Sequence, residues 1–267
     1  MPVGICKMCF YQKTLVSSHF MPRAIYDYCR SGDLEPVKFS RKVAFCTSYQ
    51  VQDYIMCKSC EDVLNDGGEK WTVGKLATMD RKSFPLYEIL SKATPQFEDG
   101  GAKVYQGVNV AGFEIEQFTH FATGILWKAS IHSWSKEKKK PKIDLGPYSD
   151  RLRKYLRGEA GFPEHVKLWL TIVPPEAAMI GFIEPHERKS FGGFKSYFCY
   201  IPGVLFCWSV GRQVTTELRV GCFATNAYHP FFVSNNVHQI LENHTKADYL
   251  GARKSGKLVK IRAAHNE

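Results

Sequence analysis

The 267-residue sequence has no long hydrophobic run, and this absence limits where the protein can reside. No segment reaches the about 18 consecutive apolar residues that a membrane-spanning helix needs. The first residues, Met1 to Cys6, contain no basic stretch followed by an apolar one, which is the pattern of a secretory signal. We therefore expect a cytoplasmic protein that is not embedded in a membrane.

Several signatures of common enzyme families are missing as well. The chain has no internal repeat, no phosphate-binding P-loop and no dinucleotide-binding glycine motif. Its downstream serine, histidine and aspartate residues form no recognisable hydrolase triad, and Gly192-Gly193 indicates a turn rather than a phosphate cradle. These patterns predict neither a nucleotide-dependent enzyme nor a triad hydrolase.

The chain does contain nine cysteines, four of which form two Cys-x-x-Cys pairs. An odd number of cysteines with pairs at this spacing fits a reducing compartment and metal binding better than a disulfide framework. Four thiolates so spaced suit one tetrahedral zinc ion, which is structural because four sulfurs leave it no open position. The predicted ligands are Cys6, Cys9, Cys57 and Cys60. The other cysteines are interpreted as buried thiols: Cys29, Cys46, Cys199, Cys207 and Cys222.

The second cysteine pair is followed by a helical pattern, Glu61-Asp62-Val63-Leu64. A first pair in a tight turn and a second pair that opens a helix are typical of a treble clef. In that arrangement the zinc ion at the helix start stabilises the thiolates. A zinc ribbon is the competing geometry, and unligated cysteines in turns are the simpler alternative.

The pattern along the chain predicts an α+β fold, and an apolar share of 44% supports a real core. A glycine-rich segment, residues 95–113, contains the turn sequence Asp99-Gly100-Gly101. We place a boundary there, between an N-terminal zinc-stabilised domain, residues 1–95, and a basic α+β domain with several antiparallel strands, residues 96–267.

Periodicity and turn residues predict the individual elements. Residues 37–47 read as a strand whose partner is residues 49–56. Helices are expected after Pro22 and over residues 118–134, 148–157 and 238–249. Further strands are expected over residues 169–173, 179–183, 197–201, 205–210 and 218–223, with a turn over residues 184–187.

The order of motifs in the first quarter of the chain resembles that of a known family. Cys-x-x-Cys is followed by Ser18-His19-Phe20-Met21-Pro22-Arg23 and then by Cys-x-x-Cys-Glu. This order resembles the zinc-stabilised HNH, or His-Me finger, endonucleases over about residues 5–70. In that family a ββα unit holds one catalytic divalent ion, a histidine at the end of the first strand activates water, and the helix supplies a ligand. The resemblance implies an endonuclease that cuts DNA with Mg²⁺ or Mn²⁺.

The family's functional positions match particular residues of this chain. His19 matches the general base, and Ser18 stands where the family usually has an aspartate that binds the ion. Glu61 matches the helical Asn or His, and as an oxygen ligand it would suit Mg²⁺ or Mn²⁺. Asn65, one helical turn further along the same face, is an alternative ligand. Arg23 is placed to hold a phosphate.

The chain departs from the family at several points. Ser18 supplies a hydroxyl in place of a carboxylate, and the family's middle asparagine has no counterpart before Cys57. The long segment after Arg23 must be an insertion within the finger. A simpler alternative remains open, in which His19 is an ordinary core histidine and Ser18 caps the helix that follows.

The formal net charge of +10 and the isoelectric point near 9.1 favour a partner that carries phosphates. Basic residues gather in a lysine run, residues 136–142, and in the predicted basic helix, so we expect the second half to grip nucleic acid. A solvated charged surface is the alternative. The predicted contacts are Arg23, Lys138, Lys139, Lys140, Arg151, Arg153 and Lys154.

Two further functions compete with the metal-dependent endonuclease. The first is a zinc-stabilised module that binds nucleic acid or protein without cutting, with Ser18 and Glu61 marking a finger that has lost its catalytic ion. The second is a strand-rich half that recognises a protein or small ligand and controls the finger. The sequence offers no specific residues for this last function, and the oligomeric state is left open.

Overall fold

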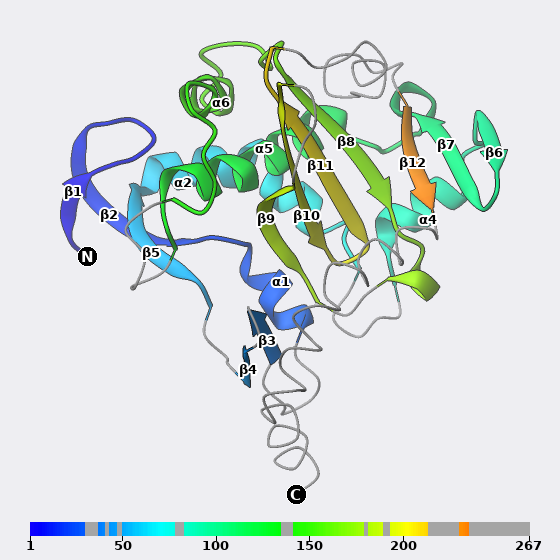
Figure 1. The fold of residues 1–267 in the computed structure, drawn as a ribbon, viewed down its shortest axis with the longest axis horizontal. Helices are drawn as coiled ribbons and strands as arrows, with labels where there is room; N and C mark the ends of the chain where they lie inside the picture. Colours follow the sequence, from blue (N-terminus) through cyan, green and yellow to red (C-terminus); the bar gives the residue numbers. More distant parts are fainter. Residues whose placement is uncertain are drawn as a thin grey trace, which may run out of the picture.

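The computed structural model describes residues 1–29, 37–40, 43–46, 50–77, 83–134, 141–178, 181–188, 193–212 and 230–234. It is a mixed α+β structure with antiparallel strands and a four-cysteine cluster near the N-terminus, so the predicted α+β class is confirmed. Figure 1 shows the N-terminal strands on one side, the long helix α5 in the middle and a large sheet on the other side. Within the described ranges, no helix has the length and apolar character needed to cross a membrane.

The elements follow one another in two groups. The N-terminal elements are β1 (Val3–Ile5), β2 (Gln12–His19), α1 (Arg23–Tyr28), β3 (Val37–Ser40), β4 (Val43–Cys46), β5 (Gln52–Cys57), α2 (Lys58–Leu64), the π-helical turn η1 (Asn65–Glu69), α3 (Lys70–Val73) and α4 (Pro85–Ser91). The later elements are β6 (Phe97–Asp99), β7 (Ala102–Gln106), η2 (Gly107–Asn109), α5 (Ile115–Ile131), α6 (Tyr148–Leu156), β8 (Val166–Ile172), η3 (Pro175–Ala177), β9 (Ile183–Arg188), β10 (Lys195–Ile201), β11 (Val204–Val210) and β12 (Pro230–Ser234).

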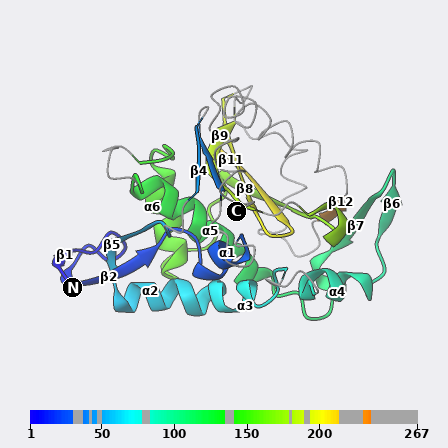
Figure 2. The ribbon, with the colours of Figure 1, turned by 90° about the horizontal axis from the view of Figure 1, so that it is seen from below.

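We call β1, β2, β5 and α2 the N-terminal unit. Strand β2 lies between β1 and β5 and pairs antiparallel with both, so that His19 lies opposite Gln52. Helix α2 begins directly after β5, with Cys57 as its N-cap residue. Glu61 lies in its first turn, where the helix dipole favours a carboxylate. Figure 2 shows α2 beside this sheet, with α3 and α4 continuing in a row away from it.

The chain between β2 and β5 contains α1 and a separate two-stranded sheet of β3 and β4. The helix predicted after Pro22 is thus confirmed. The predicted pairing of residues 37–47 with residues 49–56 is wrong, because β3 pairs with β4 and β5 pairs with β2. An alternating pattern identifies a strand, but several partners can satisfy the same pattern.

The large sheet has seven strands in the order β6-β7-β12-β8-β11-β10-β9. Its neighbours pair antiparallel except β12 and β8, which run parallel. The turn predicted at Asp99-Gly100-Gly101 joins β6 to β7. Gly100 and Gly101 have φ angles of 53° and 81°, which a tight hairpin turn of this hand requires. Segment 95–113 is therefore partly a hairpin of this sheet.

Most of the other predicted elements are present where the structure describes the chain. Helices α5 and α6 and strands β8, β10 and β11 match their predictions to within a few residues. The turn predicted over residues 184–187 is wrong, because these residues belong to β9, where the His186 ring packs 4.1 Å from the ring of Phe198. Strand β9 begins at Ile183, where the predicted strand over residues 179–183 ends. The elements predicted over residues 218–223 and 238–249 lie outside the described residues.

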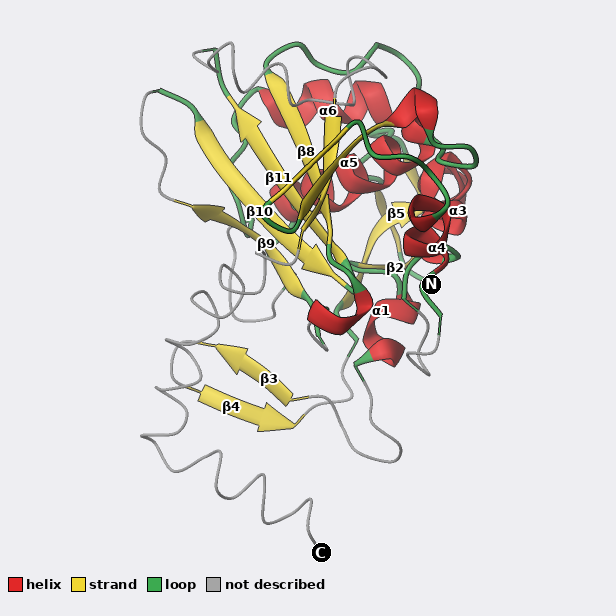
Figure 3. Ribbon diagram, turned by 90° about the vertical axis from the view of Figure 1, so that its right-hand side faces the viewer, coloured by secondary structure: helices red, strands yellow, loops and turns green. Residues whose placement is uncertain are grey.

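Helix α5 joins the two parts of the described structure. It is buried on nearly every side, as expected for a helix whose apolar residues surround its whole circumference. The ring of Phe118 packs 5.5 Å from that of Phe206 in β11. One continuous cluster of buried residues extends from Cys6 in the N-terminal unit through α5 to the large sheet, and Figure 3 shows helices on one face of that sheet. The division at residue 95 stays a prediction, because a shared core does not reveal whether either part folds alone.

Gly68 in η1 packs directly against the backbone of α5. A Cβ atom at this position would lie 2.1 Å from the carbonyl oxygen of Gln117. We expect Gly68→Ala to lower the free energy of unfolding by about 3 kcal/mol or more, since backbone must move to make room. Denaturant unfolding measures the loss. Gly74→Ala is the control, because its Cβ would meet only ordinary contacts at 3.5 Å, and equal effects of the two changes would contradict the prediction.

Candidate metal centre and the adjoining site

Four cysteines that are distant in the sequence meet in the N-terminal unit. Cys6 and Cys9 lie between β1 and β2, Cys57 ends β5, and Cys60 lies in the first turn of α2. Their sulfur atoms all lie within 4.8 Å of one another, and only Cys9 is more than slightly exposed. In the part of the chain that the structure describes, no other group of three His, Cys, Asp or Glu side chains could hold a metal ion. The four sulfurs could hold an ion such as zinc.

The surroundings of the sulfurs fit a soft cation. The N–H of Cys57 donates to Sγ of Cys6 over 3.4 Å, and Sγ of Cys57 lies 3.3 Å from Oγ of Ser59. Burial raises the pKa values of Cys6 and Cys60, and nearby sulfurs raise that of Cys60 further. Burial also opposes ionisation of Cys57, but hydrogen bonds from Ser59 and Cys60 outweigh it and lower its pKa to about 6. Four sulfurs this close cannot all ionise without a cation among them, and thiolates favour soft cations and borderline ones such as zinc.

Arg153 of α6 braces the first cysteine turn. Its Nη1 donates to the carbonyl oxygen of Met8 over 3.1 Å, and its Nε donates to Oδ1 of Asp150 over 2.8 Å. Its guanidinium lies 4.8 Å from the ring centre of Phe10, and the side chain is only 11% exposed. Arg153 is a predicted nucleic-acid contact, yet its Nε and Nη1 already have partners within the protein. Its evident role is to tie α6 to the turn that holds Cys9.

The other predicted nucleic-acid contacts that the structure describes are exposed, unlike Arg153. Arg151 and Lys154 are exposed on α6, and Nζ of Lys154 lies 3.4 Å from a carboxylate oxygen of Asp150. Arg23 is 73% exposed and lies 3.5 Å from Asp27, one helical turn away. For these side chains contact with nucleic acid stays a prediction. The remaining three, Lys138, Lys139 and Lys140, lie outside the described residues.

His19 is the last residue of β2 and is half-buried. Its Nε2 lies 3.0 Å from Oε1 of Gln50. An amide oxygen only accepts hydrogen bonds, so Nε2 carries the hydrogen and Nδ1 of the neutral ring keeps its lone pair. The carbonyl oxygen of His19 accepts a hydrogen bond from Nζ of Lys128 over 3.0 Å. Both the ring and the backbone of His19 are thus held in place.

Two oxygen atoms of the predicted ion site are buried without partners. The Ser18 side chain is fully buried, and its hydroxyl has no hydrogen-bond partner among the described residues. The same holds for Oε1 of Glu61 in α2. An unsatisfied buried oxygen costs roughly 1–3 kcal/mol, and native proteins usually satisfy it with water or an ion. Asn65, the alternative ligand, is half-buried at the start of η1.

Lys128 of α5 is a residue that the sequence reasoning missed. It is only 4% exposed, and besides its bond to His19 its Nζ lies 4.0 Å from Oε2 of Glu69. The indole nitrogen of Trp134 donates to the Lys128 carbonyl oxygen over 2.8 Å. Lys128 lines a small cavity together with Phe20, Pro22, Leu64, Glu69, His120, Phe121, Gly124 and Ile125. A single lysine inside the apolar stripe over residues 118–134 was the signal that could have pointed to it.

His120 lines the same cavity and makes stability depend on pH. Its Nε2 lies 3.0 Å from the carbonyl oxygen of Leu156, so the hydrogen is on Nε2, and Nδ1 is buried with no partner among the described residues. Burial lowers the pKa of His120, although the Leu156 carbonyl opposes this shift. At pH values below the ordinary histidine pKa of about 6.5, the unfolded chain therefore binds the proton more readily than the folded chain does. The free energy of unfolding falls as a result.

We expect His120→Gln to reduce this loss of stability on acidification, because glutamine keeps a donor for Leu156 but does not titrate. Melting temperatures of both proteins at neutral pH and at pH values below about 6 measure the difference. An identical decline in the two proteins would contradict the assignment.

Comparison of the chain with models of protein families, with curated proteins and with solved structures finds no match.

Proposed function

We propose that the protein is a metal-dependent endonuclease of the HNH type that hydrolyses phosphodiester bonds in DNA. The four cysteines hold a structural zinc ion in a treble clef. Strands β2 and β5 with helix α2 form the ββα unit, in which His19 is the general base. Ser18 and Glu61, with Asn65 as the alternative to Glu61, hold one Mg²⁺ or Mn²⁺ ion.

The main support for this proposal is the pair of buried oxygens without partners. Ser18 and Glu61 were selected by motif position, and each has a buried oxygen whose hydrogen-bonding capacity is unused among the described residues. Ser18 lies in β2, which pairs with β5, and Glu61 lies in α2, which follows β5 directly and contains Cys60. A bound ion or its waters would satisfy both atoms.

The residues of the chain have distinct tasks in the proposed reaction. Gln50 holds the His19 ring through Nε2, so that Nδ1 is left to take a proton from the attacking water. Lys128 holds the backbone of His19 and so limits movement of the ring. A divalent ion in the site would neutralise charge on the non-bridging and leaving oxygens of the phosphate. Arg23, exposed four residues after His19, is placed to bind a phosphate.

Nicking of supercoiled plasmid tests the proposal. The zinc-loaded full chain is incubated with Mg²⁺ or Mn²⁺ and, in parallel, without added divalent ion. We expect nicked circles only when the ion is present. If folded, zinc-loaded protein leaves the plasmid intact with either ion, the alternative of a non-cutting binding module is favoured, and Ser18 in place of a carboxylate is then the reason.

A further inference from the structure

Exposed apolar side chains are concentrated in the first quarter of the chain. Of the large hydrophobic residues that the described structure leaves exposed, all but Phe97 and Val108 belong to residues 1–63. Phe10 and Tyr11, directly after the first cysteine pair, are 59% and 65% exposed. A soluble protein rarely exposes neighbouring aromatic side chains unless they have a partner.

Phe10 is held in a conformation that disfavours phenylalanine. Its φ angle is 63°, in the left-handed region that glycine adopts without strain. Burial of the ring does not offset this strain. The guanidinium carbon of Arg153 lies 4.8 Å from the ring centre. Arg153 is itself fixed by Met8 and Asp150. A strained backbone at an exposed position is a reason to look for function, and Phe10 keeps 59% of its surface exposed.

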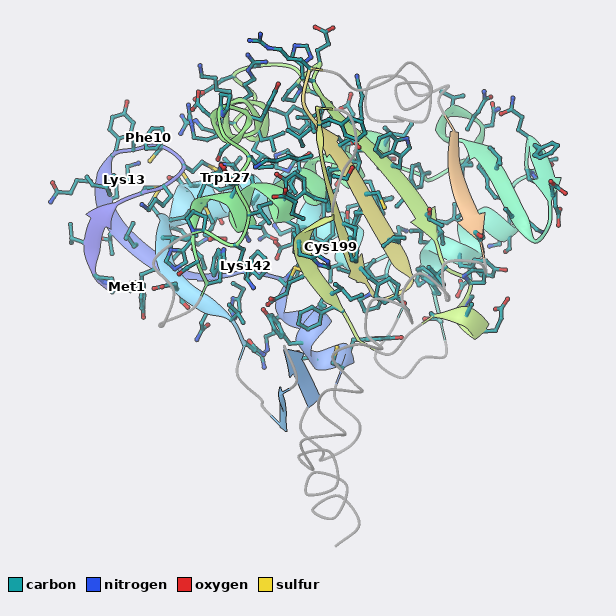
Figure 4. All side chains as sticks on the ribbon, in the orientation of Figure 1. Met1, Phe10, Lys13, Trp127, Lys142 and Cys199 are labelled. Atoms are coloured by element: carbon teal, nitrogen blue, oxygen red, sulfur yellow. The ribbon has the colours of Figure 1, made fainter. Side chains whose placement is uncertain are left out.

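A cation lies near each of the two aromatic rings, Arg153 at Phe10 and Lys13 at Tyr11. Nζ of Lys13 lies 5.9 Å from the ring centre of Tyr11, and Lys7 and Lys13 are both exposed. Figure 4 labels Phe10 and Lys13, and both lie at the outer end of the β1–β2 hairpin. The sequence contains no aspartate or glutamate before Asp27. The hairpin itself thus carries aromatic and only basic charged side chains, and the nearby carboxylates of Asp150 and Glu159 are paired with Arg153.

We propose that Phe10 and Tyr11, with Lys7 and Lys13, form a platform that binds unpaired nucleotides of a nucleic acid. Bases stack on exposed aromatic rings, and the phosphates between them are attracted by the lysines. Paired bases in a duplex are already stacked on each other, so the platform favours single-stranded or distorted segments. A second copy of this chain would bring the exposed lysines of another such hairpin against Lys7 and Lys13, and the like charges oppose this contact.

The inference extends the proposed function, because it assigns a substrate class to the proposed nuclease, but it is tested by binding alone. The probes are a fluorescently labelled single-stranded oligonucleotide and its duplex, with no divalent ion added, at low and at physiological salt. We expect Phe10→Gly to weaken single-strand binding about tenfold, the loss of one stacked base. The variant keeps its zinc and its melting temperature does not fall, because glycine relieves the strain.

Two matched variants make this experiment decisive. Phe97→Ala removes a side chain that is also 59% exposed, but from β6 in the large sheet, and it binds like the wild type. Phe10→Trp keeps an aromatic face and retains most of the affinity. Unchanged binding by Phe10→Gly, an equal loss in Phe97→Ala or tighter binding of the duplex would overturn the inference. So would a change in oligomeric state of Phe10→Gly, which would assign the platform to contacts between copies.

The results also separate this inference from the proposed function. A protein that binds single strands as expected but never nicks a plasmid refutes the nuclease and leaves the platform standing. A protein that nicks, and whose Phe10→Gly variant binds and nicks as the wild type does, refutes only the platform.

Discussion

Replacing Cys60 with serine is expected to release the zinc ion and to unfold the N-terminal unit. Cys60 is one of four sulfurs within 4.8 Å of one another, and it joins α2 to the strands that carry the other three. Structural zinc contributes about 10–16 kcal/mol in isolated finger peptides, so we expect a loss of roughly 5 kcal/mol or more here. The loss extends beyond the unit, because Cys6, Met8 and Cys57 belong to the same core as α5.

Metal analysis and thermal unfolding of the purified protein measure this effect. The wild type should contain one zinc ion per chain, and Cys60→Ser should contain much less and melt at a lower temperature. Cys29→Ser is the control, because Cys29 lies outside the cluster and is half-buried. Wild-type protein that is fully folded without any metal would show that the cluster is not a structural zinc site.

Replacing His19 with alanine is expected to abolish plasmid nicking while leaving the protein folded. Loss of a general base lowers the rate by about a hundredfold to ten-thousandfold. The fold survives because the Lys128 bond reaches the backbone carbonyl of His19 and not its ring. Zinc content and melting temperature should therefore stay near those of the wild type, which sets this variant apart from Cys60→Ser.

A second histidine provides the matched control for His19→Ala. Nε2 of His132 lies 2.9 Å from Oδ2 of Asp53, which is opposite Ser18 in the pairing of β2 with β5. His132→Ala thus removes an imidazole at the end of α5 that contacts the same pair of strands, and it should keep most of the proposed activity. Equal nicking by the wild type and His19→Ala would reject the assigned base. Equal losses in both histidine variants would point to a structural effect.

Local sequence was enough to predict the cysteine cluster and many of the secondary-structure elements. Ligand spacing is a property of a few adjacent residues, so Cys6 and Cys9 could be paired with Cys57 and Cys60 without knowledge of the fold. The helices α5 and α6 and the strands β8, β10 and β11 follow from periodicity in the same way. The pairing partner of β5 could not be predicted from periodicity, because any strand with a matching pattern could pair with it.

The surroundings of the candidate site could not be predicted from local sequence patterns. Lys128 lies 109 residues from His19 along the chain, and the hydrogen bond between them exists only because α5 packs against the N-terminal unit. Arg153 shows the same limit, since a basic helix predicts exposed cations and says nothing of one that turns inward to Met8. Short-range patterns thus determined which cysteines have the chemistry to bind a metal ion. Long-range packing alone settled how those residues are held and which cations remain exposed, because burial depends on contacts between segments far apart in the chain.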